Sequence, residues 1–152
     1  MKKIMLNLFI MVLFFGTTSC DNDESAEEVS ITAADVAAIK TIIMSGDWYI
    51  SNYFDSENQL TTDYDDFIFN FNENGTIAAT DGSSSLSGAW QLKNENSDDE
   101  SSAVIIEVHF SSPDTFKKLS EDWEVEKYTD SQVELRYTGD EEEGISLLTF
   151  AK

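Results

Sequence analysis

From Gly46 onward, apolar side chains recur at every second position in short runs, and turn-forming residues separate these runs. A period of two is that of a β-strand with one buried face, whereas a helix repeats its apolar positions every three or four residues. The connections lack the long helical crossovers that parallel strands need. The pattern therefore predicts eight antiparallel strands, over residues 48–54, 67–71, 76–80, 86–93, 104–110, 123–128, 132–137 and 145–151.

The connections between these strands predict how the sheet is arranged. Asn74-Gly75 favours a tight hairpin, because both residue types tolerate the positive φ angles of such turns. The acidic stretch Asn94 to Ser102 is expected to be a long solvated loop, and Ser112-Pro113-Asp114 opens a short helical turn through Leu119, before the sixth strand, with Pro at its first helical position. A mainly β meander of eight hairpin-linked strands favours an antiparallel up-and-down barrel, whose closure removes exposed strand edges.

One helix is expected ahead of the strands. Val36, Ile39 and Ile43 recur at helical spacing between Ser30 and Ser45, which predicts about 12 to 14 helical residues. Ser30 or Thr32 is suited to cap the start, and Gly46 to stop the end. We expect this helix to lie against a barrel mouth or over the sheet.

The first 19 residues have the pattern of a signal peptide. Lys2 and Lys3 precede an apolar run from Ile4 to Phe15, and small residues follow up to Cys20. This arrangement resembles the lipobox of bacterial lipoproteins, although Thr17 stands where Leu is commonest. The resemblance implies a signal peptide over 1–19, lipid attachment at Cys20, an acidic tether over 20–30, and one domain of helix plus β-barrel over 31–152. A secreted protein without a lipid is the alternative.

Charge and cysteine content restrict the partners. The chain has 9 Lys and Arg against 30 Asp and Glu, a formal net charge of −21, and removal of the leader would make it more negative. Such a chain is unsuited to nucleic acid or to an anionic bilayer, so a membrane would hold it only through the lipid anchor. If Cys20 carries a lipid, no thiol remains for a disulfide, a metal or a nucleophile.

Acidic residues directly behind Cys20 also resemble the surface-export signal of Bacteroidota lipoproteins. We expect an exported outer-membrane lipoprotein, with surface exposure as one of its two orientations.

Two Gly-x-Trp tripeptides, Gly46-Asp47-Trp48 and Gly88-Ala89-Trp90, begin strand patterns. A Trp at such a place plugs the end of a barrel or sandwich. With Thr62-Asp63-Tyr64, Phe69-Asn70-Phe71, Asn74-Gly75-Thr76, the 119–123 segment, Val133-Glu134-Leu135 and Leu148-Thr149-Phe150, they look like the lipocalin-like lipoproteins of Bacteroidota. That resemblance covers residues 46–152 and implies a lipocalin-like β-barrel on a lipid tether, with no established activity.

No set of residues has the pattern of an active site. His109, the single histidine, has Glu107 as a neighbour on its strand face but no evident nucleophile. Acidic runs offer oxygen ligands for a hard cation but lack the spacing and central Gly of a calcium loop, so no metal site is predicted; the runs are Asp63, Asp65 and Asp66; Asp98, Asp99 and Glu100; and Glu141 to Glu143. We expect no enzyme and no cofactor.

Aromatic residues are the candidates for binding. Most should pack in the core, and some are expected to line a cavity at one barrel end. Tyr49, Tyr53 and Tyr64 are expected to form an exposed stacking surface. The candidate ligand-binding residues are Trp48, Tyr49, Tyr53, Tyr64, Phe69, Trp90 and Trp123.

The sequence thus favours a non-catalytic, monomeric, membrane-anchored binding module. Its ligand is either a small apolar molecule in the barrel or a glycan or protein on the rim. The alternative is a structural or accessory subunit of an outer-membrane assembly. A barrel filled by its own aromatic rings would favour binding on the surface.

Overall fold

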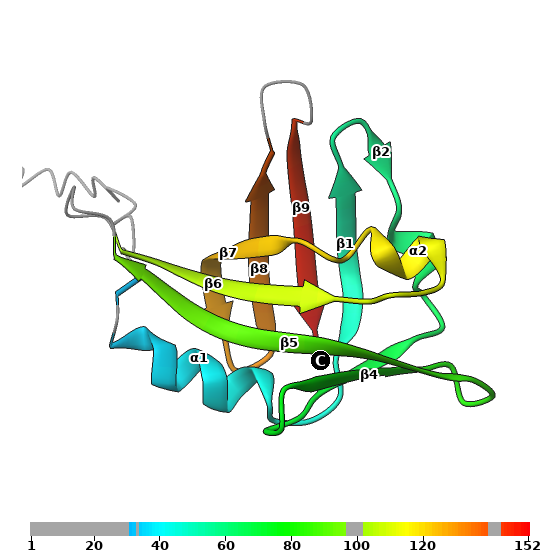
Figure 1. The fold of residues 1–152 in the computed structure, drawn as a ribbon, viewed down its shortest axis with the longest axis horizontal. Coiled ribbons are helices and arrows are strands. Elements are labelled where there is room, and N and C mark those ends of the chain that lie inside the picture. Colours follow the sequence, from blue (N-terminus) through cyan, green and yellow to red (C-terminus); the bar gives the residue numbers. More distant parts are fainter. Residues whose placement is uncertain (1–30, 33, 97–101, 140–143) are drawn as a thin grey trace, which may run out of the picture.

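The computed structural model describes residues 31–32, 34–96, 102–139 and 144–152. In this part of the chain, nine antiparallel strands form one curled sheet, accompanied by two α-helices and a 3-10 turn (Figure 1). The strands are β1 (Tyr49–Asp55), β2 (Asn58–Gln59), β3 (Ile68–Phe71), β4 (Thr76–Thr80), β5 (Ser85–Asn96), β6 (Ser102–His109), β7 (Asp122–Thr129), β8 (Gln132–Thr138) and β9 (Ile145–Ala151). The helical elements are α1 (Asp35–Ile43), η1 (Thr61–Asp63) and α2 (Asp114–Lys117).

The strand order in the sheet is β2-β1-β9-β8-β7-β6-β5-β4-β3. From β3 to β9 each strand pairs with the next, as in a meander, and β9 then pairs with β1. Trp48, just before β1, exchanges two backbone hydrogen bonds with Phe69 of β3, at N···O distances of 3.0 and 2.7 Å. The two ends of the curled sheet therefore meet at this bridge.

Each of the eight predicted strands corresponds to a strand of the sheet, but the predicted count was wrong by one. The missed strand, β2, has two exposed residues, Asn58 and Gln59, that pair with Asp55 and Phe54. An exposed pair carries no alternation of apolar and polar side chains, so the period of two could not reveal it.

The predicted acidic loop is shorter than expected. β5 continues to Asn96 and β6 begins at Ser102, and Asn94 pairs with Val104 in the ladder between them. Only residues 97–101 lie between the strands, and they are outside the described residues. Cross-strand pairing thus extends β5 and β6 over polar residues that the hydrophobic pattern had assigned to a loop.

Two irregularities help the sheet to curl. The register of β1 against β9 shifts between Ile50 and Asn52, and that of β7 against β8 shifts between Val125 and Lys127. Such bulges bend a strand and increase its twist, which lets one face close around a core.

The helix α1 covers one end of the curled sheet (Figure 1). At nine residues it is shorter than predicted, and its N-cap residue is Ala34 rather than Thr32. Ser30 lies outside the described residues, and Thr32 is a donor instead, since its backbone N–H and its hydroxyl both bond to the carboxylate of Asp35, at 2.7 and 2.8 Å. Ile39 and Ile43 are fully buried, as the helical spacing predicted.

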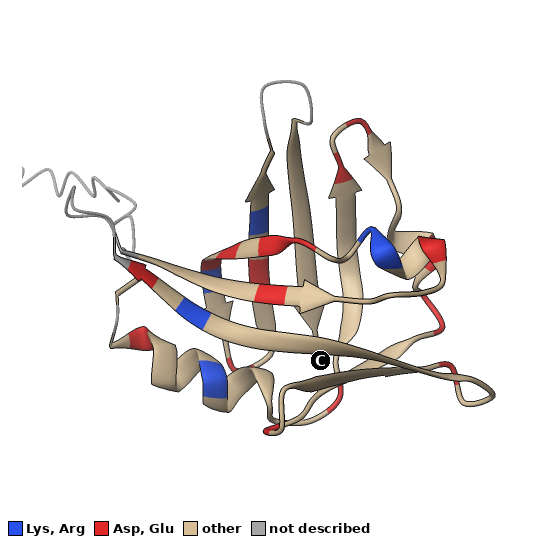
Figure 2. Cartoon of the chain, in the orientation of Figure 1, with Lys and Arg blue, Asp and Glu red and all other residues tan. Residues whose placement is uncertain are grey.

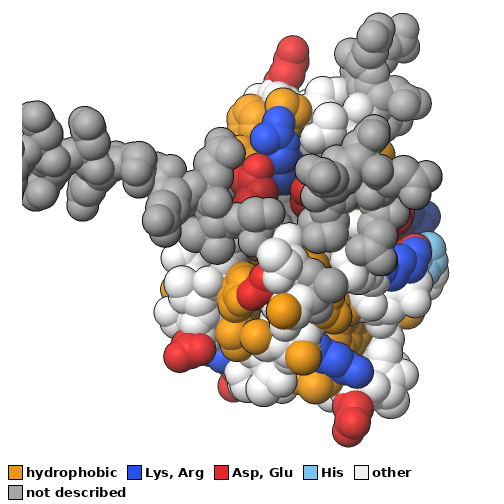
Figure 3. Space-filling view, turned by 90° about the vertical axis from the view of Figure 1, so that its left-hand side faces the viewer, with side chains coloured by type: hydrophobic (Ala, Val, Ile, Leu, Met, Phe, Trp, Pro, Cys, Tyr) orange, Lys and Arg blue, Asp and Glu red, His pale blue; other side chains and the backbone are white. Residues whose placement is uncertain are grey.

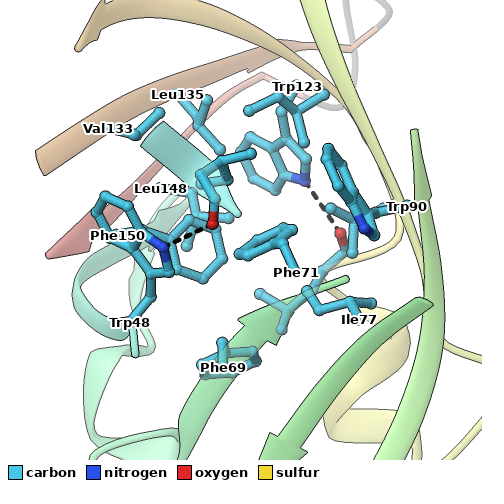
Figure 4. Packing of buried hydrophobic residues seen from close by; sticks show 14 of the residues in the cluster. Trp48, Phe69, Phe71, Ile77, Trp90, Trp123, Val133, Leu135, Leu148 and Phe150 are labelled. Carbon is cyan, nitrogen blue, oxygen red and sulfur yellow. Dashed lines mark hydrogen bonds between the residues drawn. The ribbon is translucent and has the colours of Figure 1, made fainter. Parts of the chain in front are cut away.

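Aromatic rings fill much of the interior (Figure 4). Phe150 lies edge-on to Phe69 and Phe71, with ring centroids 5.5 and 5.3 Å apart. Each tryptophan also satisfies its indole N–H by donating to a carbonyl oxygen: Trp48 to Ile43 at 2.8 Å, Trp90 to Asn72 at 2.9 Å, and Trp123 to Leu119 at 3.0 Å. Buried indoles with partners add apolar area without an unpaired donor.

The helical turn before the sixth predicted strand is present as α2, before β7. Pro113 is its N-cap rather than its first helical residue, and the Ser112-Pro113 peptide bond is cis. Phe116, at the centre of α2, is buried and lies within 6.0 Å of the Tyr64, Phe67, Phe69 and Phe110 ring centroids. One ring thus fastens α2 to the core.

Charge is distributed unevenly over the outer faces. β9 has no charged residue, whereas β6, β7 and β8 each have some (Figure 2). On the face shown in Figure 3, apolar side chains are exposed in the lower half, on the side of α1, with charged side chains around them.

Candidate functional site

A hollow of about 270 Å³ lies at the end of the strands away from α1. Its lining comes from four parts of the chain: β1, β8, β9 and the link between α2 and β7. The lining residues are Tyr53, Asp55, Lys118, Glu121, Tyr137 and Ser146. All six are polar or carry a polar group, in contrast to the apolar interior beneath them.

The bulge in β1 brings two of these residues to the inner face. Simple alternation from Ile50 places Asn52 inside and Tyr53 outside. The extra residue reverses this alternation, so that Tyr53, which pairs with buried Leu148, points inward. Asp55 is then on the inner face too, opposite Ser146 of β9. The sequence pattern alone could not reveal this reversal, because a bulge has no fixed signature in hydrophobicity.

Tyr53 and Tyr64 do not form the exposed stacking surface that the sequence predicted. Their side chains are 1% and 0% exposed, and their ring centroids are 5.7 Å apart. The Tyr53 hydroxyl donates to the Lys118 carbonyl oxygen at 2.6 Å, and the Tyr64 hydroxyl donates to the Thr115 carbonyl oxygen at 2.7 Å. Tyr53 thus holds the link after α2 against β1, and Tyr64 holds α2 against the end of η1.

The surroundings of Tyr53 are electrically negative. Burial raises the pKa of its hydroxyl well above the ordinary value, and the charges of Asp55 and Glu121 raise this pKa further. The pKa of Tyr64 is also raised, first by burial and then by the charges of Asp63 and Asp55. Both hydroxyls are therefore neutral hydrogen-bond donors at neutral pH.

Asp55 accepts a hydrogen bond from the Ser146 hydroxyl at 3.0 Å. Ser146 is 6% exposed, and it is the buried polar residue of the described core. Among the ion pairs of the described residues, no Lys or Arg pairs with Asp55. The carboxylate thus has a neutral donor as its partner rather than a cation.

The other predicted ligand-binding residues do not line this hollow. Trp48, Phe69, Trp90 and Trp123 are core residues, with at most 6% of their surface exposed. Tyr49 is 45% exposed but lies on the outer face of β1, where it pairs with Ala151. Of the seven candidates, only Tyr53 lines the hollow. The hydrophobic pattern of the sequence gave no signal for its polar neighbours there.

His109 lies beside a second hollow, of about 290 Å³, on β5 and β6. This hollow is lined by Ala89, Trp90, Gln91, Glu107 and His109. Glu107 is engaged by Lys93 at 3.0 Å and by the side-chain amide of Gln91. The described residues that line it include no Ser, Thr or Cys.

Of the three acidic runs, only Asp63, Asp65 and Asp66 lie in the described part of the chain. Among residues 31–32, 34–96, 102–139 and 144–152, which include this run, no three His, Cys, Asp or Glu side chains gather in a metal-binding arrangement. Cys20, Asp98 to Glu100, and Glu141 to Glu143 lie outside the described residues. The described helices are all too short or too polar to cross a bilayer.

No protein-family model matches the chain, and comparisons with curated proteins and with solved structures find no significant match.

Proposed function

We propose that this protein is a lipid-anchored, non-catalytic binding module that holds a small polar ligand at the rim of a lipocalin-like β-barrel. The observation that carries the proposal is the 270 Å³ hollow, which four separate parts of the chain combine to build. Binding pockets for small molecules typically combine apolar walls with a few convergent polar groups. Here Tyr53 and Tyr137 provide the rings, and Asp55, Glu121 and Ser146 the polar groups.

The packing of the interior supports binding at the rim rather than inside. The inward-facing rings of β1, β3, β7 and β9 contact one another, as in the contacts of Trp123 with Tyr53 and of Phe150 with Phe69. An apolar ligand inside the barrel would have to displace these rings. The meander order and the Trp48–Phe69 bridge support the barrel interpretation of the sheet.

Native mass spectrometry of the full chain, purified from the membrane fraction, tests rim binding. Ser146→Phe places a ring in the hollow, and we expect it to abolish a copurifying small molecule that the unaltered protein retains. Thr149→Phe adds the same ring to the outer face of β9 and serves as the matched control. A ligand that survives Ser146→Phe, in a protein that still folds, contradicts rim binding.

The proposed anchor is tested separately. We expect Cys20→Ala to abolish labelling by a fatty-acid analogue and to move the protein from the membrane fraction to the soluble fraction. Lys40→Ala, a change on the exposed side of α1, should leave both unchanged. Membrane association that persists without Cys20 rules out the lipid anchor.

An accessory subunit is the second candidate function, and the outer face of β9 and β1 favours it. Ile145 and Leu147 are 42% and 36% exposed, and Leu147 pairs with Phe54 of β1. An uncharged face on so acidic a protein fits a protein partner. If this candidate is correct, Leu147→Lys abolishes copurification of a stoichiometric membrane partner and leaves the melting temperature unchanged, while Lys in place of exposed Ser87 on β5 has no effect.

A further inference from the structure

We propose that Asn74 is a site of spontaneous deamidation, and that the hairpin turn between β3 and β4 promotes this reaction in the folded protein. The inference concerns a covalent modification of the chain and is independent of the proposed ligand. It depends on three properties of the turn: the residue that follows Asn74, the donors that hold its side-chain amide, and the access of water.

The reaction needs a main-chain nitrogen that can approach the side-chain amide. The nitrogen of Gly75 loses its proton to hydroxide and forms a bond to Cγ of Asn74, whose side-chain nitrogen then leaves as ammonia. Water opens the resulting succinimide ring to aspartate or isoaspartate, so the amide is hydrolysed without any oxidation or reduction. A side chain on the following residue would hinder the close approach of the nitrogen, and Asn74 is the one asparagine of the sequence that glycine follows.

Two donors hold the oxygen on which negative charge develops. Oδ1 of Asn74 accepts hydrogen bonds from the Thr76 backbone N–H at 3.1 Å and from the Thr76 hydroxyl at 2.7 Å. This hydroxyl also accepts a bond from the side-chain amide of Asn72 at 3.2 Å, which leaves its own proton for Asn74. Attack on Cγ moves negative charge onto Oδ1, so these donors stabilise the transition state more than the starting amide.

The turn is open to water, which the reaction also requires. The Gly75 N–H donates to the Asn72 carbonyl oxygen at 3.0 Å, and this bond must break before the nitrogen can attack. Because Asn72, Glu73 and Asn74 are exposed, water can replace the lost bond at a small net cost in free energy. The same exposure lets ammonia leave and lets water reach the succinimide ring.

The turn between β4 and β5 provides a contrast within the same protein. It contains Asp81-Gly82, and a succinimide could form there only if an uncharged carboxyl group lost water. Hydrogen bonds from the backbone N–H groups of Ser84 and Ser83, and from the Ser83 hydroxyl, lower the pKa of the Asp81 carboxyl. Its charged form therefore dominates at neutral pH, and we expect Asp81 to stay unmodified while Asn74 reacts.

Deamidation at Asn74 would weaken the attachment of Trp90. The Asn72 carbonyl oxygen accepts a hydrogen bond from the Trp90 indole at 2.9 Å, and the Gly75 carbonyl oxygen accepts one from the Trp90 backbone N–H, also at 2.9 Å. Isoaspartate at position 74 adds one carbon atom to the main chain between these two carbonyl groups. Because both bonds cannot then keep their geometry, we expect the isoaspartate form to melt at a lower temperature than the fresh protein.

Peptide mass spectrometry of the full chain, incubated in mildly alkaline buffer, tests the inference by measuring the fraction of Asn74 that is converted. We expect the folded chain to convert at least as fast as the chain unfolded in guanidinium chloride. Thr76→Val keeps the shape of the side chain and the backbone donor but removes the hydroxyl. It should slow conversion in the folded chain by about threefold, less than the loss of a donor in a closed active site, because this turn is open to water. In the unfolded chain it should have no effect.

Thr80→Val is the matched control, because it makes the same change at the other end of β4, where the hydroxyl donates to the Ser84 carbonyl oxygen instead. It should leave the conversion of Asn74 unchanged, and melting curves show that both variants fold. If Asn74 stays intact in the folded chain while it converts in the unfolded chain, the turn protects this residue and the inference is wrong. Equal rates for folded Thr76→Val and the unaltered protein would overturn the part assigned to the Thr76 hydroxyl.

Discussion

At the scale of single residues, Gly88 shows how closely the sheet is packed. A Cβ atom added at this position would lie 2.5 Å from the backbone oxygen of His109 and 3.0 Å from the Ile77 side chain. Because a backbone atom cannot move aside at little cost, we expect Gly88→Ala to destabilise the protein by about 1 to 3 kcal/mol. Urea unfolding measures this, with exposed Ser87→Ala on the same strand as the control. Equal stability of the two variants would contradict the close packing.

The two buried tyrosines predict a loss of stability in alkali. Folding raises the pKa of Tyr53 and of Tyr64, so above about pH 10 the unfolded chain releases these protons while the folded chain retains them. The contribution of these two groups to the free energy of unfolding should therefore have its full value below about pH 10 and decrease as the pH rises further. A Tyr53→Phe, Tyr64→Phe double variant should show a shallower decline, and Tyr49→Phe, at an exposed position, the same decline as the unaltered protein. Chemical denaturation across this pH range provides the comparison.

At the scale of elements, a side-chain hydrogen bond ties the N-terminal end of α1 to the sheet. The Tyr128 hydroxyl of β7 donates to the Asp35 carboxylate at 2.6 Å, and this bond is the largest cause of the lowered pKa of Asp35. We expect Tyr128→Phe to speed amide hydrogen exchange in α1 at neutral pH, since the carboxylate then loses its main donor.

In acid, the unaltered protein and the Tyr128→Phe variant should no longer differ in the amide exchange rates of α1. Because folding lowers the pKa of Asp35, its charged form stabilises the fold at pH values above the ordinary pKa of an aspartate. This contribution disappears as the pH falls through the pKa of the folded state. Exchange rates of the two proteins should therefore converge in acid. Rates in α1 that are equal already at neutral pH would show that the bond does not hold the helix.

Prediction from sequence worked where one physical pattern dominates an element. Alternation located Val104, Ile106 and Val108 of β6, and the Asn74-Gly75 pair located the hairpin of β3 and β4. In that turn only Gly75 has a positive φ, of 80°. The inward orientation of Tyr53 was missed because it depends on a bulge, and the burial of Tyr64 because it depends on distant Thr115.

At the scale of the whole molecule, the excess of acidic side chains should oppose folding. A net charge of −21 repels itself most in the compact state, and dissolved ions screen that repulsion. We expect the melting temperature to rise with NaCl concentration. A melting temperature that stays constant or falls as NaCl is added would contradict this prediction.

The candidate site was harder to predict than the fold, and the reason lies in how it is built. Asp55, Glu121 and Ser146 are far apart in the sequence and unremarkable among 30 acidic residues and many serines. Only the pairing of β1 with β9, and the bonds of Tyr53 and Tyr64 to the segment of α2, bring them together. Local patterns describe single elements, whereas this hollow depends on contacts between elements.

The pairing of β1 with β9 also determines when the sheet can be completed. Tyr49 of β1 pairs with Ala151 of β9, so this edge of β1 stays unpaired until the last strand has been synthesised. Contacts between such distant segments form slowly, and a nascent chain that stops before Ile145 leaves the backbone of β1 available to other strands. Incomplete copies on the ribosome are therefore expected to depend on chaperones.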